Sequence, residues 1–470
     1  MAIATHNPTT GETLNTFPAL DNTQLDTILQ QVSVASIGWA ATPIAARTAC
    51  LERAAQQLRA QRDRYAALIT LEMGKPIREA RAEVEKCATG CEFYAQQAEH
   101  FLADEVIASD GGKTAPAFSA LPPSMAVAGK SYIAYLPLGT LLAIMPWNFP
   151  FWQAFRTAVP ALVAGNCVLL KHASNVPQCA LAIEDVFRTN FPANVLRTLL
   201  IGPDQAEQLI ADARIHAVTL TGSEAAGRRI AAAAGTHLKK SVLELGGADA
   251  FVVLADADLD DAARLAVASR FLNGGQSCIA AKRIILVESI AEDFLKRFTS
   301  RLLQLKQGDP THEDTDIGPM ARADLRDALH QQVVESIRKG ALLRLGGEPV
   351  AGPGNYYKVS LLDQVRPGMP AYEEELFGPV AAVIRAQDET DALRIANDSR
   401  FGLGGSVCTR DARRGERFAR AMQCGQAFVN GMVKSDPRLP FGGVKASGYG
   451  RELALHGIHE FVNIKTIWIG

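Results

Sequence analysis

The chain has 470 residues, of which 48% are hydrophobic and 21% are charged, and its formal net charge is −2. This length allows two or three domains with large cores, and the composition is typical of a globular protein. Because the charge is nearly balanced and the Lys and Arg residues are dispersed, neither nucleic acid nor an anionic membrane surface is expected as a partner.

Neither an export signal nor a membrane helix is predicted. The first residues, MAIATHNPTTGETLN, lack a basic start followed by an apolar stretch, and prolines interrupt the long uncharged segment 131–155. Eight cysteines in such a chain favour reduced thiols and a cytoplasmic location. Cys87 and Cys91 belong to an apolar stripe at helical spacing with Val84 and Tyr94, so we expect core residues there rather than metal ligands.

The first hundred residues predict helices. Apolar residues recur at helical spacing at Leu25, Ile28, Val32, Ala35 and Trp39. The segment 47–73, RTACLERAAQQLRAQRDRYAALITLEM, continues the same pattern.

From about residue 140, short apolar runs that end in turn residues alternate with segments of helix length. The runs are TLLAIMPWNFP, CVLLKHASN, AVTLTGS and SVLELGG. This alternation predicts a parallel sheet with helices on its faces. A second series, AFVVL, RIILV, VAAVI and GGSVCT, predicts a second α/β domain, with the boundary near Gly246 and Gly247.

A dinucleotide-binding turn is one interpretation of residues 216–235, HAVTLTGSEAAGRRIAAAAG. Gly222 and Gly227 would let the backbone approach a phosphate at the start of the helix. The segment lacks the G-x-G-x-x-G spacing and the lysine of a P-loop, so an ordinary strand–turn–helix packing site remains an alternative. Lys171, at the end of CVLLK, is a candidate contact to ribose or phosphate, although a single lysine at a strand end is usually just solvated.

Cys278, in NGGQSCIAAKR, is a candidate nucleophile, with a small buried residue as the alternative. Acyl transfer to a thiol needs donors for the oxyanion and a base for deacylation. Asn148, in the turn MPWNFP, can supply an amide donor beside the Cys278 backbone N–H, and Glu244 ends a strand where desolvation would raise its pKa. None of the nine histidines stands in a papain-like or caspase-like setting. The spacing of these residues along the sequence does not by itself show that they belong to one site.

Six motifs occur in the order of the NAD(P)-dependent aldehyde dehydrogenases: MPWNFP, TGS, LELGG, GGQSC, EEELFGP and PFGGVKASGYGRE. The chain resembles this family over essentially its whole length, and within it the bacterial succinate-semialdehyde dehydrogenase branch. The resemblance implies an α/β fold with a Rossmann-like cofactor domain, an α/β catalytic domain and a small bridging β segment for oligomerisation. The implied ranges are 1–118 and 138–246 for the first, 247–457 for the second, and 119–137 and 458–470 for the third.

The resemblance also implies the roles of individual residues. Cys278 would be the nucleophile, Glu244 the general base and Asn148 the oxyanion donor, with no metal required. The implied cofactor-binding residues are Met145, Trp147, Lys171, Ser174, Gly222, Ser223, Leu245, Glu375 and Phe377. The implied substrate-binding residues are Arg156, Ser435 and Arg438. The partner is then a small-molecule aldehyde, and the assembly a homodimer or homotetramer.

Individual positions refine this expectation. Ser174 stands where members that demand NAD usually carry a glutamate, so NADP should be accepted and NAD is also possible. Arg156, eight residues after Asn148, would pair with the distal carboxylate of succinate semialdehyde or a similar short aldehyde, unless it is a surface arginine. Two departures weaken the match: Leu272 replaces a second arginine of some semialdehyde enzymes, and Thr157 replaces a frequent lysine.

Other functions remain open at this point. They are a general dehydrogenase for uncharged aldehydes, a CoA-acylating relative, a structural protein that keeps only the fold, and a cysteine hydrolase without a cofactor. Glu244 argues against the CoA-acylating subgroup, which generally lacks this base. The complete set of Cys278, Glu244 and Asn148 argues against a purely structural role.

Overall fold

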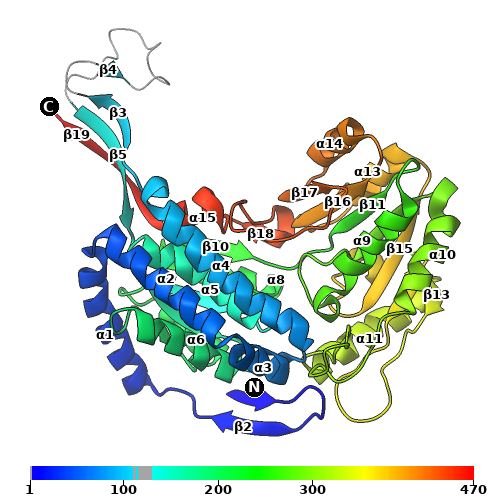
Figure 1. Ribbon diagram of the computed structural model, residues 1–470, viewed down its shortest axis with the longest axis horizontal. Helices are drawn as coiled ribbons and strands as arrows, with labels where there is room; N and C mark the ends of the chain where they lie inside the picture. The colour runs from blue at the N-terminus through cyan, green and yellow to red at the C-terminus, as the bar shows by residue number, and fades with distance from the viewer. Residues whose placement is uncertain (1–2, 110–112, 115–129) are drawn as a thin grey trace.

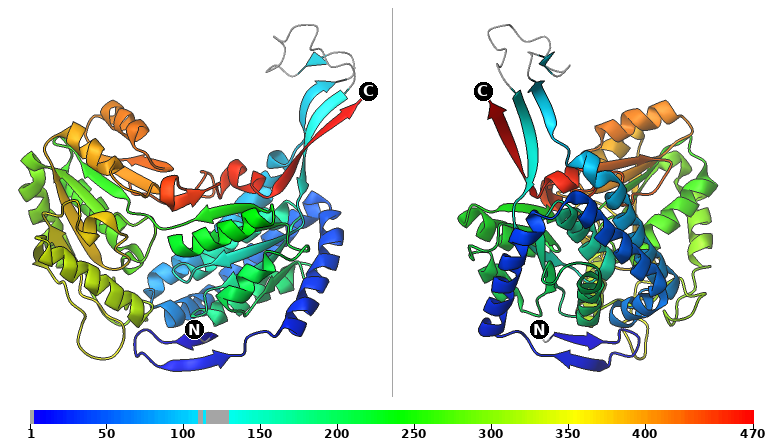
Figure 2. Two further views of the ribbon diagram at one scale, coloured as in Figure 1. Left: turned by 180° about the vertical axis from the view of Figure 1, so that it is seen from behind. Right: turned by 60° about the vertical axis from the view of Figure 1, so that its left-hand side comes forward.

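The computed structural model describes residues 3–109, 113–114 and 130–470. Two α/β units lie side by side, and a narrow β arm extends from the unit that contains the N-terminal helices (Figure 1). The views in Figure 2 show that the arm projects away from both units and carries the C-terminus.

The chain begins with a hairpin that the sequence analysis missed. Strands β1 (Ile3–His6) and β2 (Thr13–Phe17) pair antiparallel. Gly11, with φ of 81°, donates its N–H to the Asn7 carbonyl at 2.8 Å and closes the connection. Expecting only helices before residue 100 was therefore wrong for this segment. The three strand-favouring threonines in β1 and β2, together with the glycine turn, outweigh the lack of apolar alternation.

The predicted N-terminal helices follow the hairpin. They are α1 (Asn22–Ala40), α2 (Ile44–Ala60), α3 (Arg62–Met73) and α4 (Ile77–Phe101). A capping box between Asp21 and Gln24 begins α1, whose buried face includes Leu25, Val32 and Trp39. These contacts confirm the predicted helical stripe.

The first sheet belongs to the N-terminal unit. Its strands, in spatial order, are β18 (Gly448–Tyr449), β10 (Lys240–Glu244), β9 (Ala217–Thr221), β6 (Thr140–Met145), β7 (Cys167–His172) and β8 (Leu196–Thr198). All neighbours are parallel except β18, which runs antiparallel to β10. The helices of this part are α5 (Pro150–Val163), α6 (Pro177–Asn190), α7 (Pro203–Leu209) and α8 (Glu224–Thr236). The predicted parallel sheet is confirmed.

The register of this sheet brings the ends of its strands together. Ile144 pairs with both Lys171 and Leu220, and Leu220 pairs with Leu243. The residues that follow these strands therefore meet at one edge, where parallel α/β sheets bind ligands.

The second sheet forms the other unit. Its spatial order is β13 (Leu342–Leu345), β14 (Ser360–Asp363), β15 (Val380–Ala386), β12 (Arg283–Val287), β11 (Ala250–Val253), β16 (Gly404–Cys408) and β17 (Gln426–Val429). Only β13 is antiparallel to its neighbour. The helices that follow β11 are α9 (Leu259–Phe271), α10 (Ala291–Leu302), α11 (Ala323–Arg338), α12 (Pro370–Glu373), α13 (Glu389–Asn397), α14 (Ala412–Ala421) and α15 (Ala454–His459).

The domain ranges stay a prediction. The two sheets show where the expected boundaries lie relative to the strands. The expected boundary near Gly246 lies in the connection between β10 and β11. β18 lies inside the range 247–457 yet pairs with the first sheet.

The arm is a four-stranded antiparallel sheet. Its order is β19 (Val462–Ile469), β5 (Lys130–Pro137), β3 (Glu105–Ser109) and β4 (Lys113–Thr114). The predicted oligomerisation segment 119–137 overlaps it through β5, whereas residues 119–129 lie outside the described residues. β3 and β4 precede that segment and were not expected in the arm.

Several simpler expectations can be compared directly with the fold. Cys87 and Cys91 are fully buried in the core on α4, and all eight cysteines are free thiols. Within the described ranges, no helix combines the length and apolar character needed to span a bilayer. The same residues contain no cluster of three or more His, Cys, Asp or Glu side chains suited to a metal ion.

Candidate active site

Cys278 lies on a sharply turned loop after α9. Asn273, Gly274 and Gly275 have φ values of 55°, 60° and 74°. A Cβ atom at Gly275 would lie 2.2 Å from the Gly378 carbonyl oxygen, so only glycine fits there. The NGG turn thus brings the cysteine loop against the segment that precedes β15.

The Asn148 turn contacts this loop directly. The Asn273 side-chain amide donates to the Asn148 carbonyl at 2.8 Å, and the Asn148 side-chain amide donates to the Gln276 carbonyl at 3.1 Å. Asn148 is buried, with 4% of its surface exposed. The oxyanion donor and the nucleophile predicted from separate motifs are therefore held together by side-chain-to-backbone hydrogen bonds.

A buried ion pair supports the same turn from α4. Glu83 pairs with Lys75 and accepts hydrogen bonds from the backbone N–H groups of Phe151 and Trp152 at 2.9 and 3.0 Å. The carboxylate thereby caps the N-terminus of α5. The Lys75 ammonium also lies 3.7 Å from the centre of the Phe149 ring. Nothing in the sequence motifs indicated these two residues.

The Cys278 thiol opens into a pocket of about 70 Å³. Arg156, Leu272 and Ser435 line it, as do three aromatic side chains and Lys86, which the sequence analysis did not single out. The aromatic residues are Phe149, Trp152 and Phe441. The pocket is therefore largely apolar, with a few polar and cationic groups, as small-molecule sites usually are.

Burial raises the pKa of the Cys278 thiol to about 12, while the positive charges of Lys282 and Arg156 act in the opposite direction. Lys282 is almost completely buried and donates to the carbonyls of Ser277 and Cys278, each at 2.7 Å. It also pairs with Glu375 at 3.0 Å. At neutral pH the free pocket holds a thiol, which must lose its proton before it attacks a carbonyl.

Glu244 is the last residue of β10 and is 1% exposed. Within the described parts of the chain, neither carboxylate oxygen has a hydrogen-bond partner. Burial raises the pKa of Glu244 well above its usual value, and the negative charge of Glu452 adds to the effect. A carboxylate with a raised pKa and free oxygens is suited to accept a proton near neutral pH.

Arg156 is 3% exposed, so the alternative of a surface arginine is wrong. Its guanidinium forms a buried ion pair with Glu452 and lies 4.6 Å from the centre of the Phe441 ring. Thr157, which replaces the frequent lysine, donates to the second oxygen of Glu452 at 2.6 Å. Glu452 ends the motif PFGGVKASGYGRE, and no role was predicted for it.

The other two predicted substrate residues lie differently. Ser435 is buried and lines the Cys278 pocket. Arg438 is exposed, does not line that pocket, and pairs with Asp436 at 2.7 Å.

A wider groove of about 530 Å³ borders the ends of the first sheet. Ser223, which caps α8, and Gly246 line one side, and Glu375 from the other unit lines the opposite side. Glu375 accepts the Gly247 N–H at 3.1 Å, and Phe377 packs edge-to-face on Trp147 with 5.7 Å between ring centres. These contacts bring together predicted cofactor residues from both units.

Lys171 is the clearest sign that this edge of the sheet suits an anionic ligand. Its side chain is 8% exposed, and burial lowers its pKa. In the described part of the chain, its ammonium has neither an ion pair nor a hydrogen bond. A buried cation without a counter-charge, at the same edge of the sheet as the N-terminus of α8, fits the phosphates of a dinucleotide.

The remaining predicted cofactor residues lie along the same edge. Met145 ends β6, and Ser174 follows β7, half-buried, with its carbonyl accepting the Ala4 N–H at 3.0 Å. Gly222 donates its N–H to the Glu244 carbonyl at 3.0 Å. Leu245 packs so closely on α8 that a Cβ atom at Gly227 would lie 2.6 Å from it.

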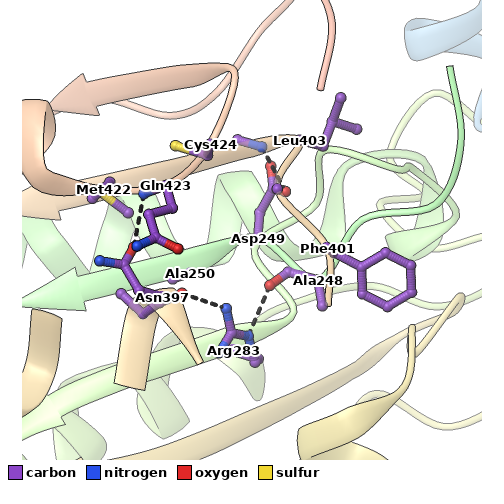
Figure 3. A pocket seen from close by; sticks show the side chains of 13 residues that line it. Ala248, Asp249, Ala250, Arg283, Asn397, Phe401, Leu403, Met422, Gln423 and Cys424 are labelled. Carbon is purple, nitrogen blue, oxygen red and sulfur yellow. Dashed lines mark hydrogen bonds between the residues drawn. The ribbon is translucent and has the colours of Figure 1, made fainter. Parts of the chain in front are cut away.

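A separate, smaller pocket lies inside the second unit, beside the connection from β10 (Figure 3). Arg283 donates to the Ala248 and Ala396 carbonyls at 2.8 and 2.9 Å, and Asp249 accepts the Gly404 N–H at 2.9 Å. No residue lines both this pocket and the one at Cys278. The polar groups of this pocket form hydrogen bonds between the ends of strands, and they do not line the pocket of the Cys278 thiol.

The aldehyde dehydrogenase family model matches residues 1–467. The chain belongs to the aldehyde dehydrogenase family. The resemblance drawn from the six motifs, and the fold it implied, are confirmed.

Two relatives match this aldehyde dehydrogenase over essentially its full length. A probable succinate-semialdehyde dehydrogenase [NADP(+)] of Synechocystis is 51% identical, with 100% of both chains covered. A succinate-semialdehyde dehydrogenase [NADP(+)] of Mycobacterium avium is 47% identical over 100% of this chain and 97% of its own. The solved succinic semialdehyde dehydrogenase of Streptococcus pyogenes with NADP+ has a TM-score of 0.93 and 35% identity, and covers 99% of both chains.

Proposed function

We propose that this aldehyde dehydrogenase oxidises succinate semialdehyde, or a similar short carboxylated aldehyde, to the acid, with NADP as the preferred cofactor. The observation that carries the proposal is the Cys278 pocket, which combines a thiol with the cationic side chains of Lys86 and Arg156. Attraction between these groups and a carboxylate would hold the aldehyde end of a short substrate near the sulfur. The two relatives named as NADP-dependent succinate-semialdehyde dehydrogenases support the same substrate and cofactor.

The chain's own residues supply the acyl-transfer chemistry. Cys278 loses its proton and its sulfur adds to the aldehyde carbon, while the Asn148 amide and the Cys278 N–H donate to the oxyanion. When bound, the nicotinamide cofactor accepts the hydride, so that the sulfur is left holding a thioester. Glu244 then takes a proton from water, which attacks the thioester and releases the acid and the thiol.

The cofactor would lie across the edge of the first sheet. Lys171 and the N-terminus of α8 would hold phosphate groups, Glu375 the ribose next to the nicotinamide, and Trp147 and Phe377 the walls of the cleft. Ser174 is short and neutral, so it would not repel a 2′-phosphate as a glutamate would. This supports NADP, and it leaves NAD as a weaker substitute.

Hydrolysis is favoured over transfer to CoA. Glu244 is a buried carboxylate with free oxygens, which suits the activation of water. Transfer to CoA needs no such base, because the incoming thiol of CoA is itself the nucleophile.

The arm supports assembly of identical chains, and the free thiols support a cytoplasmic location. β19 leaves apolar side chains exposed, including Ile464 and Ile469 at 58% and 52%. A homodimer or homotetramer would bury them. Eight unpaired cysteines are typical of a reducing compartment.

The test is a comparison of initial rates with succinate semialdehyde, glutarate semialdehyde and hexanal, each with NADP and with NAD, followed by the absorbance of the reduced nicotinamide. The value of kcat/KM for succinate semialdehyde with NADP should exceed that for hexanal by about 100-fold. The Cys278→Ala variant should bind NADP and give no turnover. Equal rates with hexanal, or product formation only with CoA, would contradict the proposal.

A further inference from the structure

Lys282 lies four residues after Cys278, directly before β12, and is 1% exposed. Its ammonium donates to the Ser277 and Cys278 carbonyls, each at 2.7 Å, and lies 3.0 Å from one carboxylate oxygen of Glu375. An ammonium has three protons, so each proton has one of these oxygens as its acceptor. The lysine is therefore held by two segments of the chain, the loop of the nucleophile and the segment before β15.

Glu375 divides its two oxygens between the protein and the wider groove at the end of the first sheet. Its Oε1 atom binds the Lys282 ammonium and accepts the Gly247 N–H, at 3.0 and 3.1 Å. In the described part of the chain, no group donates to its Oε2 atom, which would lie 2.5 Å from a Cβ atom added at Gly246. Gly246 and Glu375 both line the groove. One oxygen is thus anchored, and the other is available to a ligand in the groove.

Gly247 closes this network of contacts. A Cβ atom added there would lie 2.5 Å from the Cys278 carbonyl oxygen, which is the oxygen that accepts from Lys282. The N–H of the same glycine donates to Glu375. Gly247 follows Glu244 by three residues, in the connection from β10 to β11. The contacts therefore join the cysteine loop, the connection after the general base and the segment of Glu375.

The pairing of Lys282 with Glu375 goes beyond what the turn itself requires. The two carbonyls of the cysteine loop need hydrogen-bond donors, which a neutral side chain could supply. A buried ammonium has a desolvation cost, which the nearby carboxylate offsets. Hydride transfer requires the nicotinamide ring and the carbon on the sulfur to be held at a fixed separation, and an error of about 1 Å can slow such a step about 100-fold. A contact from the backbone of the nucleophile to a carboxylate of the cofactor groove meets this requirement.

We propose that Lys282 is a positioning residue for hydride transfer, because it links the backbone of Cys278 to the carboxylate of Glu375. This inference rests on the proposed function, in which Glu375 holds the ribose next to the nicotinamide. Lys282 lines neither the Cys278 pocket nor the groove, so it acts through the two groups that it holds. By binding Oε1 it leaves Oε2 for the ribose, and by binding the loop it fixes the sulfur relative to the nicotinamide ring.

The same ammonium influences the charge of the thiol. Burial raises the pKa of the Cys278 thiol, and the charges of Lys282 and of Arg156 on α5 lower it. The negative charges of Glu375 and of Glu244 on β10 act with burial. Loss of the lysine charge therefore leaves a smaller fraction of thiolate at any pH below this pKa. A change that only loosened the loop would instead expose the sulfur and increase its rate of alkylation.

The decisive variant is Lys282→Met, which keeps the length of the side chain and removes its charge and its donors. The Glu375 side chain is 21% exposed, so water can solvate its carboxylate when the lysine is absent. In stopped-flow single turnovers with full-length enzyme in excess, NADPH formation from succinate semialdehyde should slow by about 10- to 100-fold. Deuterium on the aldehyde carbon should then slow the variant more than wild type, because hydride transfer limits the rate. A wild-type rate and isotope effect would overturn the proposal.

Alkylation by iodoacetamide tests the link in the free enzyme, without cofactor or substrate. At pH 8, Lys282→Met should react about 3- to 10-fold more slowly than wild type, and Glu375→Gln should react faster. Glu373 is exposed on α12, and Glu373→Gln should react like wild type. Faster alkylation of Lys282→Met would show that the lysine only fills space, contrary to the proposal.

A double-mutant cycle tests whether Lys282 acts through Glu375. Lys282→Met and Glu375→Gln should each raise Kd for NADP about 10-fold, measured by quenching of tryptophan fluorescence. In the double variant the two effects should not multiply, because each change removes the same ion pair. Lys296 is exposed on α10, and Lys296→Met should bind NADP like wild type. A Kd raised by the product of the two single effects would contradict the coupling.

The outcomes distinguish this inference from the proposed function. If wild-type enzyme makes no NADPH from any of the aldehydes, the proposed function fails, and the alkylation rates still decide whether Lys282 links the two groups. If wild type is active and Lys282→Met matches it in single turnovers and in Kd for NADP, only the role of Lys282 is overturned. Should Lys282→Met not fold, as judged by circular dichroism, the partly exposed Glu375 decides: alkylation of Glu375→Gln faster than that of Glu373→Gln supports the link, and equal rates overturn it.

Discussion

The reactivity of Cys278 is governed by charged groups of its own loop and of two other segments, α5 and the end of β10. Burial raises the pKa of the thiol to about 12, and Lys282 and Arg156 counteract that rise. Lys282 also fixes the loop through the Ser277 and Cys278 carbonyls. The thiol must therefore lose its proton before it attacks, whereas the raised pKa of Glu244 suits that carboxylate to take a proton from the water that attacks the thioester.

Glu244→Gln separates the two halves of the reaction. Glutamine has the same shape, and no hydrogen bond to either Glu244 oxygen is lost among the described residues. It cannot take a proton from water, so steady-state turnover should fall by about 100- to 10,000-fold. Acylation should persist, which predicts a rapid burst of about one NADPH per active site in stopped-flow measurements, as expected for accumulation of an acyl-enzyme.

An exposed glutamate on α14 provides the control for this variant. Glu416→Gln changes a surface charge and should leave both the burst and the steady-state rate as in wild type. Loss of the burst in Glu244→Gln, together with the steady-state rate, would instead give Glu244 an essential role in activating the thiol.

For single residues, the motifs predicted the reactive side chains but not the side chains that surround them. Cys278, Glu244 and Asn148 stand in short motifs that carry the family resemblance, and the fold brings the cysteine and asparagine loops into contact. Lys86 was missed because α4 shows only its core stripe of Val84, Cys87 and Cys91 in the sequence. Which side of that helix faces a pocket depends on α5 and on residues 433–441, far along the chain.

Among the secondary-structure elements, whether a strand could be predicted from the sequence depended on the apolar content of that strand. β6, β7, β9, β10, β11, β12, β15 and β16 are runs of buried residues, and all were expected. β8, β13, β17 and β18 are short or exposed, and β1 and β2 are rich in threonine. Such strands form because a partner strand is present, and that partner is not encoded locally.

Asp249, just before β11, joins that strand to β16. One of its oxygens accepts the Gly404 N–H at 2.9 Å, and the other has no partner in the described residues. Burial raises the pKa of this carboxyl from 3.8 to about 7. The folded protein therefore keeps a proton that the unfolded chain releases between these two values, and this group's contribution to stability is lost as pH rises through that window.

Asp249→Asn should remove this pH dependence. Asparagine keeps the oxygen that accepts from Gly404 and carries no charge at any pH. Relative to wild type, the melting temperature of the variant should be about 1–3 °C higher at pH 8 than at pH 5. Thermal unfolding followed by tryptophan fluorescence at both pH values measures this difference. The exposed Asp104→Asn variant is the control, and a difference for Asp249→Asn that does not vary with pH would contradict the assignment.

For the whole molecule, the arm is the feature least explained by a single chain. β19 pairs with β5 over its full length, from Val462 opposite Pro137 to Ile469 opposite Lys130. No other described strand pairs with β19. Its apolar side chains remain exposed on a projecting sheet (Figure 1). A long apolar edge strand promotes association unless it is covered, and the homodimer or homotetramer proposed above would supply that cover.

The resemblance indicated an oligomerisation segment, but the strand pattern alone did not reveal the arm. β3 and β5 are separated in sequence by residues 110–129, most of which lie outside the described residues. β19 joins them from the other end of the chain. Pairing between elements more than 300 residues apart leaves no local signal, because each strand is amphipathic or exposed in its own right.

Ile464→Lys tests the arm as an interface. Ile464 is 58% exposed in the single chain, so lysine is tolerated there unless a neighbouring chain covers it. Burial of an unpaired ammonium in an interface costs several kcal/mol, by rough estimate, which is enough to dissociate a dimer at micromolar concentration. Sedimentation velocity should show a smaller species for Ile464→Lys and the wild-type assembly for Ile464→Val. Because Cys278 and Asn148 are brought together within a single chain, turnover per chain with succinate semialdehyde should remain measurable in the smaller species. A wild-type protein that sediments as a monomer, or an Ile464→Lys variant that sediments like wild type, would exclude this face of the arm as the contact.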